Sequence, residues 1–318
     1  AKRMIEEVSR VGGNAIKFQA YKAETLASRF SPAYWDTRKE PTRSQFELFK
    51  KHDKFWKKEF EELADYCKTY KIDFLATPFD MESVDFLDPL MNSFKIASAD
   101  ITNKPLLEKI ASKEKPVLLS TGASTMGEIR RAIELLKRHG AGDITLLHCV
   151  LNYPTRWEDA NLWRIVRLSE NFPGHRIGYS DHTSSDSMME VLPLAWMLGA
   201  EVIEKHYTWN KNLPGNDHYH AMDFKDLKQL VEKFKRLEKM MGSGVDYLES
   251  ESVARKYARR SLVATRNIRK GEIIRRTDIT SKRPGTGVSP WKIESIVGRT
   301  AKKNIQEDEI LTEDSVEC

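Results

Sequence analysis

Cysteine is scarce in this chain: its 318 residues include three, Cys67, Cys149 and Cys318, which lie far apart in the sequence. An odd number of widely spaced cysteines argues against a disulfide framework and is typical of proteins of the reducing cytoplasm. Long apolar runs are missing as well, since no stretch approaches the roughly 18 consecutive apolar residues of a membrane-spanning helix. Nor do the first residues show a signal-peptide pattern. We therefore expect a cytoplasmic protein without disulfides and without a membrane segment.

Blocks of like charge are also missing. Lys and Arg number 52 against 47 Asp and Glu, a formal net charge of +5, and the two signs are interleaved along the sequence. Interleaved charge disfavours a nucleic-acid partner, whereas a modest positive field suits a small anionic substrate. No G-x-G-x-x-G motif follows the first expected strand, which disfavours a dinucleotide-binding fold. The remaining composition, 40% hydrophobic and 31% charged, is typical of a globular protein with an ample core.

Short apolar runs alternate with stretches of helical period, which predicts strands separated by amphipathic helices. Repeated strand–helix units indicate an α/β fold with a parallel sheet, either an open doubly wound sheet or a (β/α)8 barrel. A helical segment opens the chain at Ala1 with no strand before it, so we expect the first βα unit to lack its strand and further residues to lie upstream. One missing strand added to seven makes eight, which favours the barrel. The predicted strands are residues 14–19, 73–78, 93–98, 116–121, 144–149, 176–180 and 201–206.

The texture of the sequence changes after a helical stretch that ends near Met241. A polar connector follows, and from Arg259 onward the chain has short apolar segments punctuated by Gly and Pro, typical of a small, mostly β module. We therefore predict a barrel domain over residues 1–245, a linker over 246–258 and a small domain over 259–318.

Polar side chains follow most of the predicted strands, at the end where a parallel barrel gathers its functional residues. Two lysines among several hydroxyls could hold a phosphate or carboxylate, and two histidines on neighbouring strands could share one metal ion. Each residue also has an ordinary interpretation, as a solvated lysine or a hydrogen-bonded loop histidine. A third interpretation remains open, in which Lys95 or Lys205 forms a Schiff base as in aldolases. The residues at these strand ends are Lys17, Thr77, Lys95, Ser98, Ser120, Thr121, His148, Asn152, Ser180, His182 and His206.

Two predicted loops could lie over the mouth of the barrel. In residues 213–223, Asp217 could hydrogen-bond a polyol. His218 and His220 alternate in that loop and would point in opposite directions, which disfavours a metal site made by both. The loop of residues 20–54 is long for a βα connection and carries several aromatic residues. It is either a cover for the substrate or an insertion packed on the flank of the barrel.

Seven motifs occur along the chain in the order KFQ, ATPFD, FKIASADITNKPLLEKIA, KPVLLSTGAS, LLHCVLNYPT, IGYSDHT and GAEVIEKHYT. Together they resemble the sialic acid synthase family, whose members make nine-carbon acidic sugars from phosphoenolpyruvate. The terminal RRSLVATRNIRKGEII…KRPGTG is similar to the SAF module of that family, which is related to type III antifreeze protein. The resemblance covers nearly the whole chain. It implies a (β/α)8 barrel whose antifreeze-like domain reaches into the partner's active site in a domain-swapped homodimer.

The resemblance also implies a role for a set of residues. His182 and His206 match the metal-binding histidines, which usually serve Mn²⁺, with Mg²⁺ or Co²⁺ as alternatives. Lys95 and Asp100 are expected to act in catalysis with them, and Arg283 matches an arginine that the partner's small domain lends to the acyl group of the sugar. The residues expected at phosphoenolpyruvate are Lys17, Thr77, Lys95, Ser98, Ser120 and Ser180, and those expected to contact the sugar or shape its site are Asp100, Tyr153 and Asp217.

The implied reaction joins phosphoenolpyruvate to an open-chain N-acylated hexosamine, such as N-acetylmannosamine, with a metal polarising the aldehyde and phosphate leaving by C–O cleavage. Synthesis of legionaminic or pseudaminic acid is an alternative reaction within the same family. A protein that binds carbohydrate without catalysing a reaction is a further alternative. The sequence departs from the family pattern at two points. The first strand, with its glutamate-containing EIG-NH-G segment, is absent, and Asn152 directly precedes Tyr153, where some members have the asparagine two positions before the tyrosine.

Overall fold

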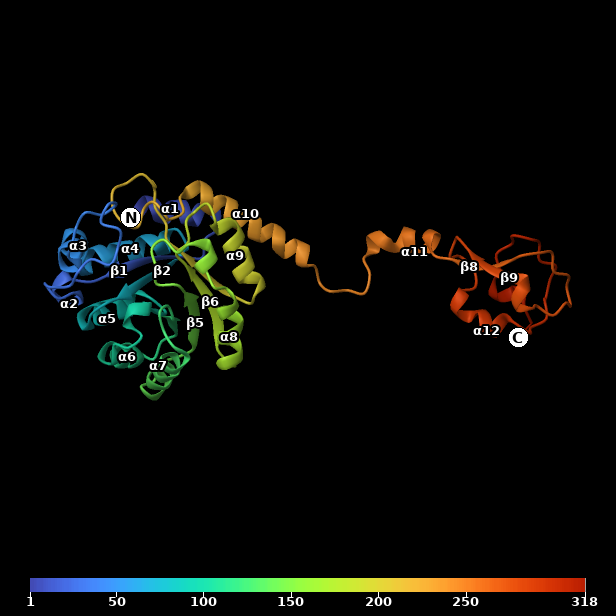
Figure 1. Ribbon diagram of the computed structural model, residues 1–318, viewed down its shortest axis with the longest axis horizontal. Helices are drawn as coiled ribbons and strands as arrows, with labels where there is room; N and C mark the ends of the chain where they lie inside the picture. The colour runs from blue at the N-terminus through green and yellow to red at the C-terminus, as the bar shows by residue number, and fades with distance from the viewer. Residues whose placement is uncertain (318) are drawn as a thin grey trace. The chain divides into compact units, whose positions relative to one another are not determined.

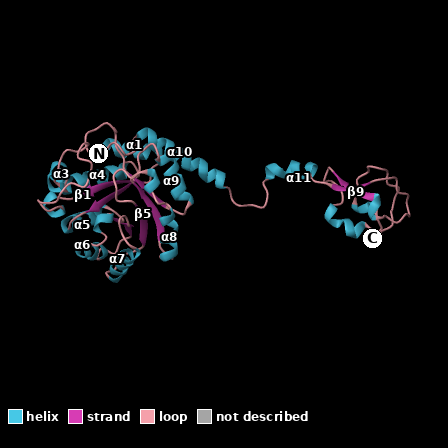
Figure 2. Ribbon diagram, in the orientation of Figure 1, coloured by secondary structure: helices cyan, strands magenta, loops and turns pink. Residues whose placement is uncertain are grey.

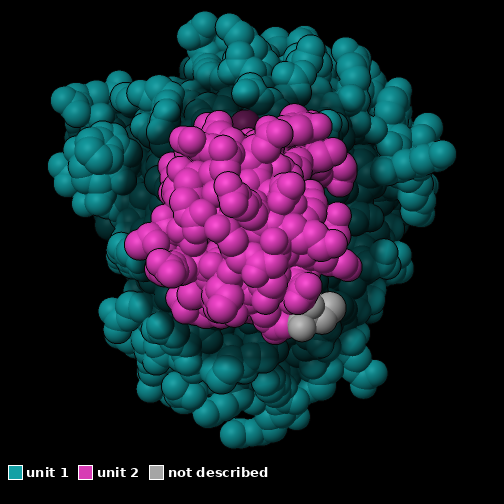
Figure 3. Space-filling model, turned by 90° about the vertical axis from the view of Figure 1, so that its right-hand side faces the viewer, with its two compact units in different colours: residues 1–239 teal, residues 240–318 magenta. Residues whose placement is uncertain are grey.

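The computed structural model describes residues 1–317, which fold into two compact units (Figure 1). Ala1–Lys239 form unit 1, and unit 2 begins at Met240 (Figure 3). Each unit has a hydrophobic core of its own. Over residues 1–317, every helix is too short or too polar to cross a membrane.

Unit 1 is built on seven parallel strands with helices around their outer side (Figure 2). Backbone hydrogen bonds join the strands in the orders β1-β2 and β3-β4-β5-β6-β7. Every pairing therefore joins strands that are consecutive in the chain, without the reversal of order that marks an open doubly wound sheet. The prediction of a (β/α) barrel fold is confirmed. The strands are β1 (Ala15–Ala20), β2 (Asp73–Pro78), β3 (Phe94–Ile96), β4 (Val117–Ser120), β5 (Ile144–Cys149), β6 (Arg176–Asp181) and β7 (Val202–Lys205).

The helices of unit 1 form because apolar residues recur on one face and polar caps close their first turns. In α7, the Thr125 side chain accepts a hydrogen bond from the Glu128 backbone N–H, and the Glu128 carboxylate accepts one from the Thr125 N–H at 2.7 Å. Ile129, Ile133 and Leu136 form the buried face of α7. The helices are α1 (Lys2–Val11), α2 (Ala23–Leu26), α3 (Gln45–His52), α4 (Lys57–Thr69), α5 (Met81–Leu87), α6 (Lys104–Ala111), α7 (Met126–Arg138), α8 (Trp163–Asn171), α9 (Met188–Met197) and α10 (Phe224–Met241).

The observed strands begin and end within two residues of the predicted ones. The largest difference is β3, which stops at Ile96 because Ser98–Asp100 turn into a short 3-10 helix. Within the described chain, β1 and β7 are not hydrogen-bonded to each other. Side chains nevertheless connect this part of the barrel, since the Tyr207 hydroxyl, just after β7, donates to the Glu7 carboxylate of α1 at 2.6 Å.

Unit 2 is small and rich in turns. It contains α11 (Ser252–Ala258), the antiparallel pair β8 (Ser261–Ala264) and β9 (Ile279–Lys282), and α12 (Ile293–Ile296). Isolated bridges such as Ile268 with Ile305 extend the β pairing. The predicted linker 246–258 includes α11, and the predicted boundaries at 245 and 258 stay predictions.

Candidate functional site

Four polar side chains converge inside the barrel at the carboxyl ends of its strands. Because side chains alternate along a strand, Ser180 of β6 and its register partner Glu204 of β7 face the same side, and the Ser180 hydroxyl donates to the Glu204 carboxylate at 2.9 Å. The same carboxylate oxygen lies 3.3 Å from the Lys17 ammonium and 3.9 Å from that of Lys95. Glu204 thus sits between the two lysines predicted to hold the anionic substrate.

Glu204 was not among the predicted site residues. Burial alone would raise the pKa of its carboxyl group, but the charges of Lys17 and Lys95 outweigh that effect, so the pKa lies below its usual value. Glu204 is therefore ionised at neutral pH. The sequence could have indicated Glu204, because residues 204 and 206 are two positions apart and side chains two positions apart on a strand lie on the same face.

Lys95 is buried, with 3% of its surface exposed. Its ammonium group donates to the Ser120 hydroxyl at 2.7 Å and to the Ile96 carbonyl at 3.2 Å. Burial lowers the pKa of Lys95 to about 8, although the nearby Glu204 opposes that shift. The lysine is consequently close to its titration point at physiological pH, and a bound anion would favour its charged form.

Hydroxyl groups line the site beside the lysines. The Ser98 hydroxyl accepts a hydrogen bond from the Gly122 N–H at 2.9 Å and lies 2.8 Å from the Cys149 sulfur. A Cβ at position 122 would meet that sulfur at 2.6 Å, so the STG turn requires glycine there. The Thr77 hydroxyl is buried and has no hydrogen-bond partner among the described residues. An orphaned buried hydroxyl at this position is what a phosphate or carboxylate ligand would satisfy.

The two histidines predicted to bind a metal lie next to each other. The rings of His182 and His206 have centroids 5.2 Å apart. His182 Nδ1 lies 2.7 Å from the Val150 carbonyl oxygen, which can only accept, so Nδ1 carries the proton and Nε2 keeps a lone pair. Burial lowers the pKa of His182 to about 4 and that of His206 to about 3. Both imidazoles are therefore neutral near pH 7, the form that binds metals.

Two residues of the 213–223 loop, Asp217 and His220, lie close to His206. Ligand atoms of His206, Asp217 and His220 all lie within 4.8 Å of one another. His218 instead pairs its Nδ1 with the Thr208 hydroxyl at 2.8 Å. The Tyr153 ring lies 4.2 Å from the His182 ring, centroid to centroid. Imidazole nitrogens together with a carboxylate make a donor set that fits a divalent transition metal.

Other predicted residues lie outside this cluster. Asp100 accepts from the Asn103 side chain at 3.0 Å, and burial raises the pKa of its carboxyl group. Asn152 is exposed in its loop. Arg283, in unit 2, is exposed just before a proline.

Two residues considered at the sequence level point to the outer side of the strands. His148 donates from Nε2 to the Ala160 carbonyl at 2.8 Å, and its ring lies 5.4 Å from that of Tyr179. Lys205 forms a buried ion pair with Asp181 at 2.7 Å. A lysine held in this way is a poor candidate for a Schiff base, which leaves Lys95 as the better candidate for that chemistry.

The long segment between β1 and α4 touches the mouth of the barrel. The Lys39 ammonium lies 3.6 Å from the centroid of the Tyr219 ring, in the 213–223 loop. The segment is ordered by its own contacts, such as those of the Trp35 indole N–H with the Glu40 and Thr42 carbonyls, both at 3.1 Å. These contacts favour the interpretation of the segment as a cover over the barrel mouth.

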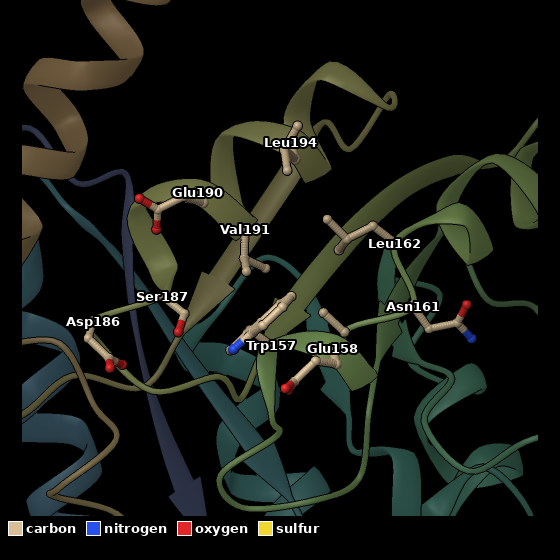
Figure 4. Close-up of a pocket in the computed structure, with 10 residues that line it drawn as sticks. Trp157, Glu158, Asn161, Leu162, Asp186, Ser187, Glu190, Val191 and Leu194 are labelled. Carbon is tan, nitrogen blue, oxygen red and sulfur yellow. The ribbon is translucent and has the colours of Figure 1, made fainter.

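A surface pocket of about 530 Å³ lies elsewhere, between the start of α8 and α9 (Figure 4). It is lined by Trp157, Leu162, Val191 and Leu194 together with polar residues, and none of the predicted site residues is among those that line it. The pocket is thus separate from the cluster inside the barrel.

Comparison with known proteins identifies the family. An uncharacterised protein of Methanocaldococcus jannaschii is 42% identical over 314 residues, which cover 98% of this chain and 88% of that protein. N,N'-diacetyllegionaminic acid synthase of Campylobacter jejuni is 38% identical over 319 residues, covering 98% of this chain and 94% of that enzyme. The crystal structure of N-acetylneuraminic acid synthetase from Leptospira borgpetersenii, in complex with citrate, aligns with a TM-score of 0.68 at 38% identity, over 80% of this chain and 83% of that one.

Family matches account for both units. Residues 259–317 match the SAF domain, and residues 4–246, well over half of the chain, match the NeuB family. The resemblance to sialic acid synthases is thereby confirmed. The chain belongs to the NeuB family and carries a SAF domain in its C-terminal part.

Proposed function

We propose that this protein condenses phosphoenolpyruvate with the aldehyde of an open-chain N-acylated hexosamine, giving a nine-carbon acidic sugar and phosphate. One observation carries the proposal: the Lys17–Glu204–Lys95 cluster, of which Lys95 is buried, lies beside neutral imidazoles at the carboxyl ends of the barrel strands. Relatives with the printed names N,N'-diacetyllegionaminic acid synthase and pseudaminic acid synthase, at 38% and 34% identity, support this class of reaction.

The anionic substrate is assigned to the lysines and hydroxyls. Lys17 and Lys95 neutralise the phosphate and carboxylate of phosphoenolpyruvate, and the orphaned Thr77 hydroxyl gains a partner on binding. The remaining contacts are assigned to Ser98, Ser120 and Ser180. Fixing both reactants at one strand end lowers the entropic part of the barrier.

The sugar is assigned to the histidine side of the site. His182 and His206 would hold a divalent metal, for which the family resemblance implies Mn²⁺, and Asp217 and Tyr153 contact the sugar. When bound, that metal acts as a Lewis acid toward the aldehyde. Asp100 stays a proposed contributor at the edge of the site.

The reaction forms one carbon–carbon bond and breaks the bond between carbon 2 and the bridging oxygen of phosphoenolpyruvate. Carbon 3 of phosphoenolpyruvate attacks the aldehyde carbon, the aldehyde oxygen takes up a proton, and carbon 2 becomes an oxocarbenium centre. Water adds to carbon 2 and gives up one proton, which leaves a hydroxyl group there. The bond between carbon 2 and the bridging oxygen then breaks, the hydroxyl becomes the ketone, and its proton leaves with the phosphate. The ionised Glu204 carboxylate supplies negative charge beside the developing cation and keeps the two ammonium groups in position.

The SAF domain and a second copy of the chain belong to the same proposal. In a domain-swapped homodimer, Arg283 of the partner subunit would contact the acyl group of the sugar. The exposed position of Arg283 in unit 2 leaves its guanidinium available for such a contact.

The experiment is a substrate panel with Mn²⁺, phosphoenolpyruvate carrying ¹⁸O in the bridging position, and N-acetylmannosamine or the di-N-acetylated hexose that leads to legionaminic acid. We expect phosphate release that depends on the sugar, with the ¹⁸O label in the phosphate. The His182→Ala variant should lose this activity. Absence of release across the panel would contradict synthase activity and favour a carbohydrate-binding protein.

A second candidate, a Schiff-base aldolase, is favoured by the lowered pKa of Lys95. Borohydride treatment in the presence of pyruvate would then attach a three-carbon adduct to Lys95, and EDTA would leave the activity intact. We expect no adduct and inactivation by EDTA.

A further inference from the structure

We propose that His220 is a further ligand of the metal, which it would hold together with His206 and one oxygen of Asp217, beside His182. The second oxygen of Asp217 then remains available to the sugar. An additional nitrogen ligand would widen the preference of the site for Co²⁺, Fe²⁺ or Zn²⁺ over Mn²⁺ and Mg²⁺. The inference rests on the proposed function in one respect, that the site takes a divalent metal.

The first observation is the state of the His220 side chain. It is fully buried, at 0% exposure, and within the described chain neither of its ring nitrogens has a hydrogen-bond partner. A buried polar group without a partner is unfavourable because it has lost the hydrogen bonds that water would give it. Both ring nitrogens of His220 lack a partner, and a metal ion would provide one of them with a ligand bond.

The second observation is the position of the ring. The centroids of His206 and His220 are 5.1 Å apart, almost the same as the 5.2 Å between His182 and His206. Two imidazoles on one tetrahedral ion, with metal–nitrogen bonds of about 2.0–2.1 Å, would have centroids about 5 Å apart. His220 therefore lies as close to His206 as His182 does, although its ring is inclined to that of His206 by 46° and the ring of His182 by 88°.

The carboxylate completes the set. An Asp217 oxygen lies 3.7 Å from His220 Nε2 and 4.0 Å from His206 Nδ1, beyond hydrogen-bond distance in both cases. Ligand atoms that share one tetrahedral ion are about 3.4 Å apart. Small side-chain movements would thus bring the three groups onto one ion.

The histidine two residues earlier provides an internal comparison. His218 already has a partner in the Thr208 hydroxyl at 2.8 Å. The same loop therefore contains one histidine satisfied by the protein and one that is not. The ordinary alternative for His220 is an aromatic packing role against Tyr153 and Tyr219, whose ring centroids lie 6.1 Å and 5.3 Å away.

The experiment measures metal binding rather than turnover. The full-length chain, His220→Asn and the matched control His218→Asn are stripped with EDTA, and Co²⁺ and Mn²⁺ affinities are measured by calorimetry. We expect Co²⁺ binding to weaken about 100-fold in His220→Asn and Mn²⁺ binding to weaken less than about tenfold, with little change in His218→Asn. Pulsed EPR of the Cu²⁺-loaded proteins counts coordinated imidazoles, and we expect one fewer in His220→Asn alone.

Two results would overturn the inference. One is an unchanged imidazole count and an unchanged Co²⁺ to Mn²⁺ affinity ratio in a His220→Asn protein whose circular dichroism and melting temperature match the wild type. The other is a rise in KM for the sugar with unaltered metal affinity, which would assign His220 to the substrate instead. A wild-type protein that binds metal through His220 but releases no phosphate would contradict the proposed function and leave this inference standing.

Discussion

The two faces of β6 and β7 carry buried charges that differ in how completely they are satisfied. On the outer face, Asp181 accepts from the Tyr179 hydroxyl at 2.9 Å, from the Thr183 N–H at 3.0 Å and from the Thr183 hydroxyl at 2.9 Å, and it pairs with Lys205 at 2.7 Å. On the inner face, one residue earlier on each strand, Glu204 accepts one hydrogen bond within the described residues, from Ser180, and lies 3.3 Å from the Lys17 ammonium and 3.9 Å from that of Lys95.

This difference distinguishes a carboxylate that stabilises the fold, Asp181, from one that serves the site, Glu204. A buried carboxylate with all its acceptor sites occupied is held for stability, since breaking such a pair strands a charge in the interior. A buried carboxylate between loosely placed ammonium groups keeps those groups free to receive another anion. Neighbouring residues on the same two strands therefore have opposite expected phenotypes when they are replaced.

The largest effect is expected from Glu204→Gln. The amide keeps the shape of the side chain but removes the negative charge between Lys17 and Lys95, so kcat/KM for phosphoenolpyruvate should fall about 1,000-fold, or about 4 kcal/mol. The melting temperature should hardly change. Phosphate-release kinetics and thermal melts measure the two quantities, and a variant with near-normal kcat/KM would remove Glu204 from the site.

The opposite pattern is expected for Asp181→Ala. Removal of this carboxylate leaves the Lys205 ammonium buried without its partner, which should lower the free energy of unfolding by about 3 kcal/mol. The folded fraction should keep most of its activity. Urea denaturation measures the loss, and the double variant Asp181→Ala with Lys205→Met should recover part of it. Equal losses in the single and double variants would show that the ion pair is not the cause.

Much of the barrel could be predicted because strand and helix periods are local properties of the sequence. The predicted positions of β2 and β5 match the observed bounds. β3 was predicted too long because the extended pattern continues through residues that the fold turns into a 3-10 helix.

The site was harder to predict than the fold, because pairing and burial depend on contacts between distant segments. The alternation of side chains along β7 could have indicated that Glu204 lies on the same face as His206. It could not have indicated that two lysines lie next to Glu204. The unpartnered state of His220 is a property of the folded loop, and alternation within residues 213–223 gave no reason to connect it with His206.

A smaller effect is expected from the pH dependence of Lys95. Because burial lowers the pKa of Lys95 to about 8, its ammonium charge is present below about pH 8 and is lost above it. The affinity of the metal-free protein for phosphoenolpyruvate should therefore fall about tenfold from about pH 7 to about pH 9. Calorimetric titration at several pH values measures it. In Lys95→Arg, which keeps its charge, the fall should be absent, and a flat wild-type profile would contradict the assignment.

The smallest effects are expected from a matched pair of threonines. Thr77→Val removes a buried hydroxyl without a partner, so stability should be unchanged or slightly higher, while KM for phosphoenolpyruvate should rise about tenfold. Thr183→Val removes a hydroxyl that donates to Asp181 at 2.9 Å and should cost about 1.5–3 kcal/mol of stability with KM unchanged. Steady-state kinetics and urea denaturation on both variants give the four values. A Thr77→Val variant that lost stability and kept its KM would show that the unpartnered hydroxyl of Thr77 does not bind substrate. Buried groups without a partner could then no longer be distinguished by function from buried groups that have one.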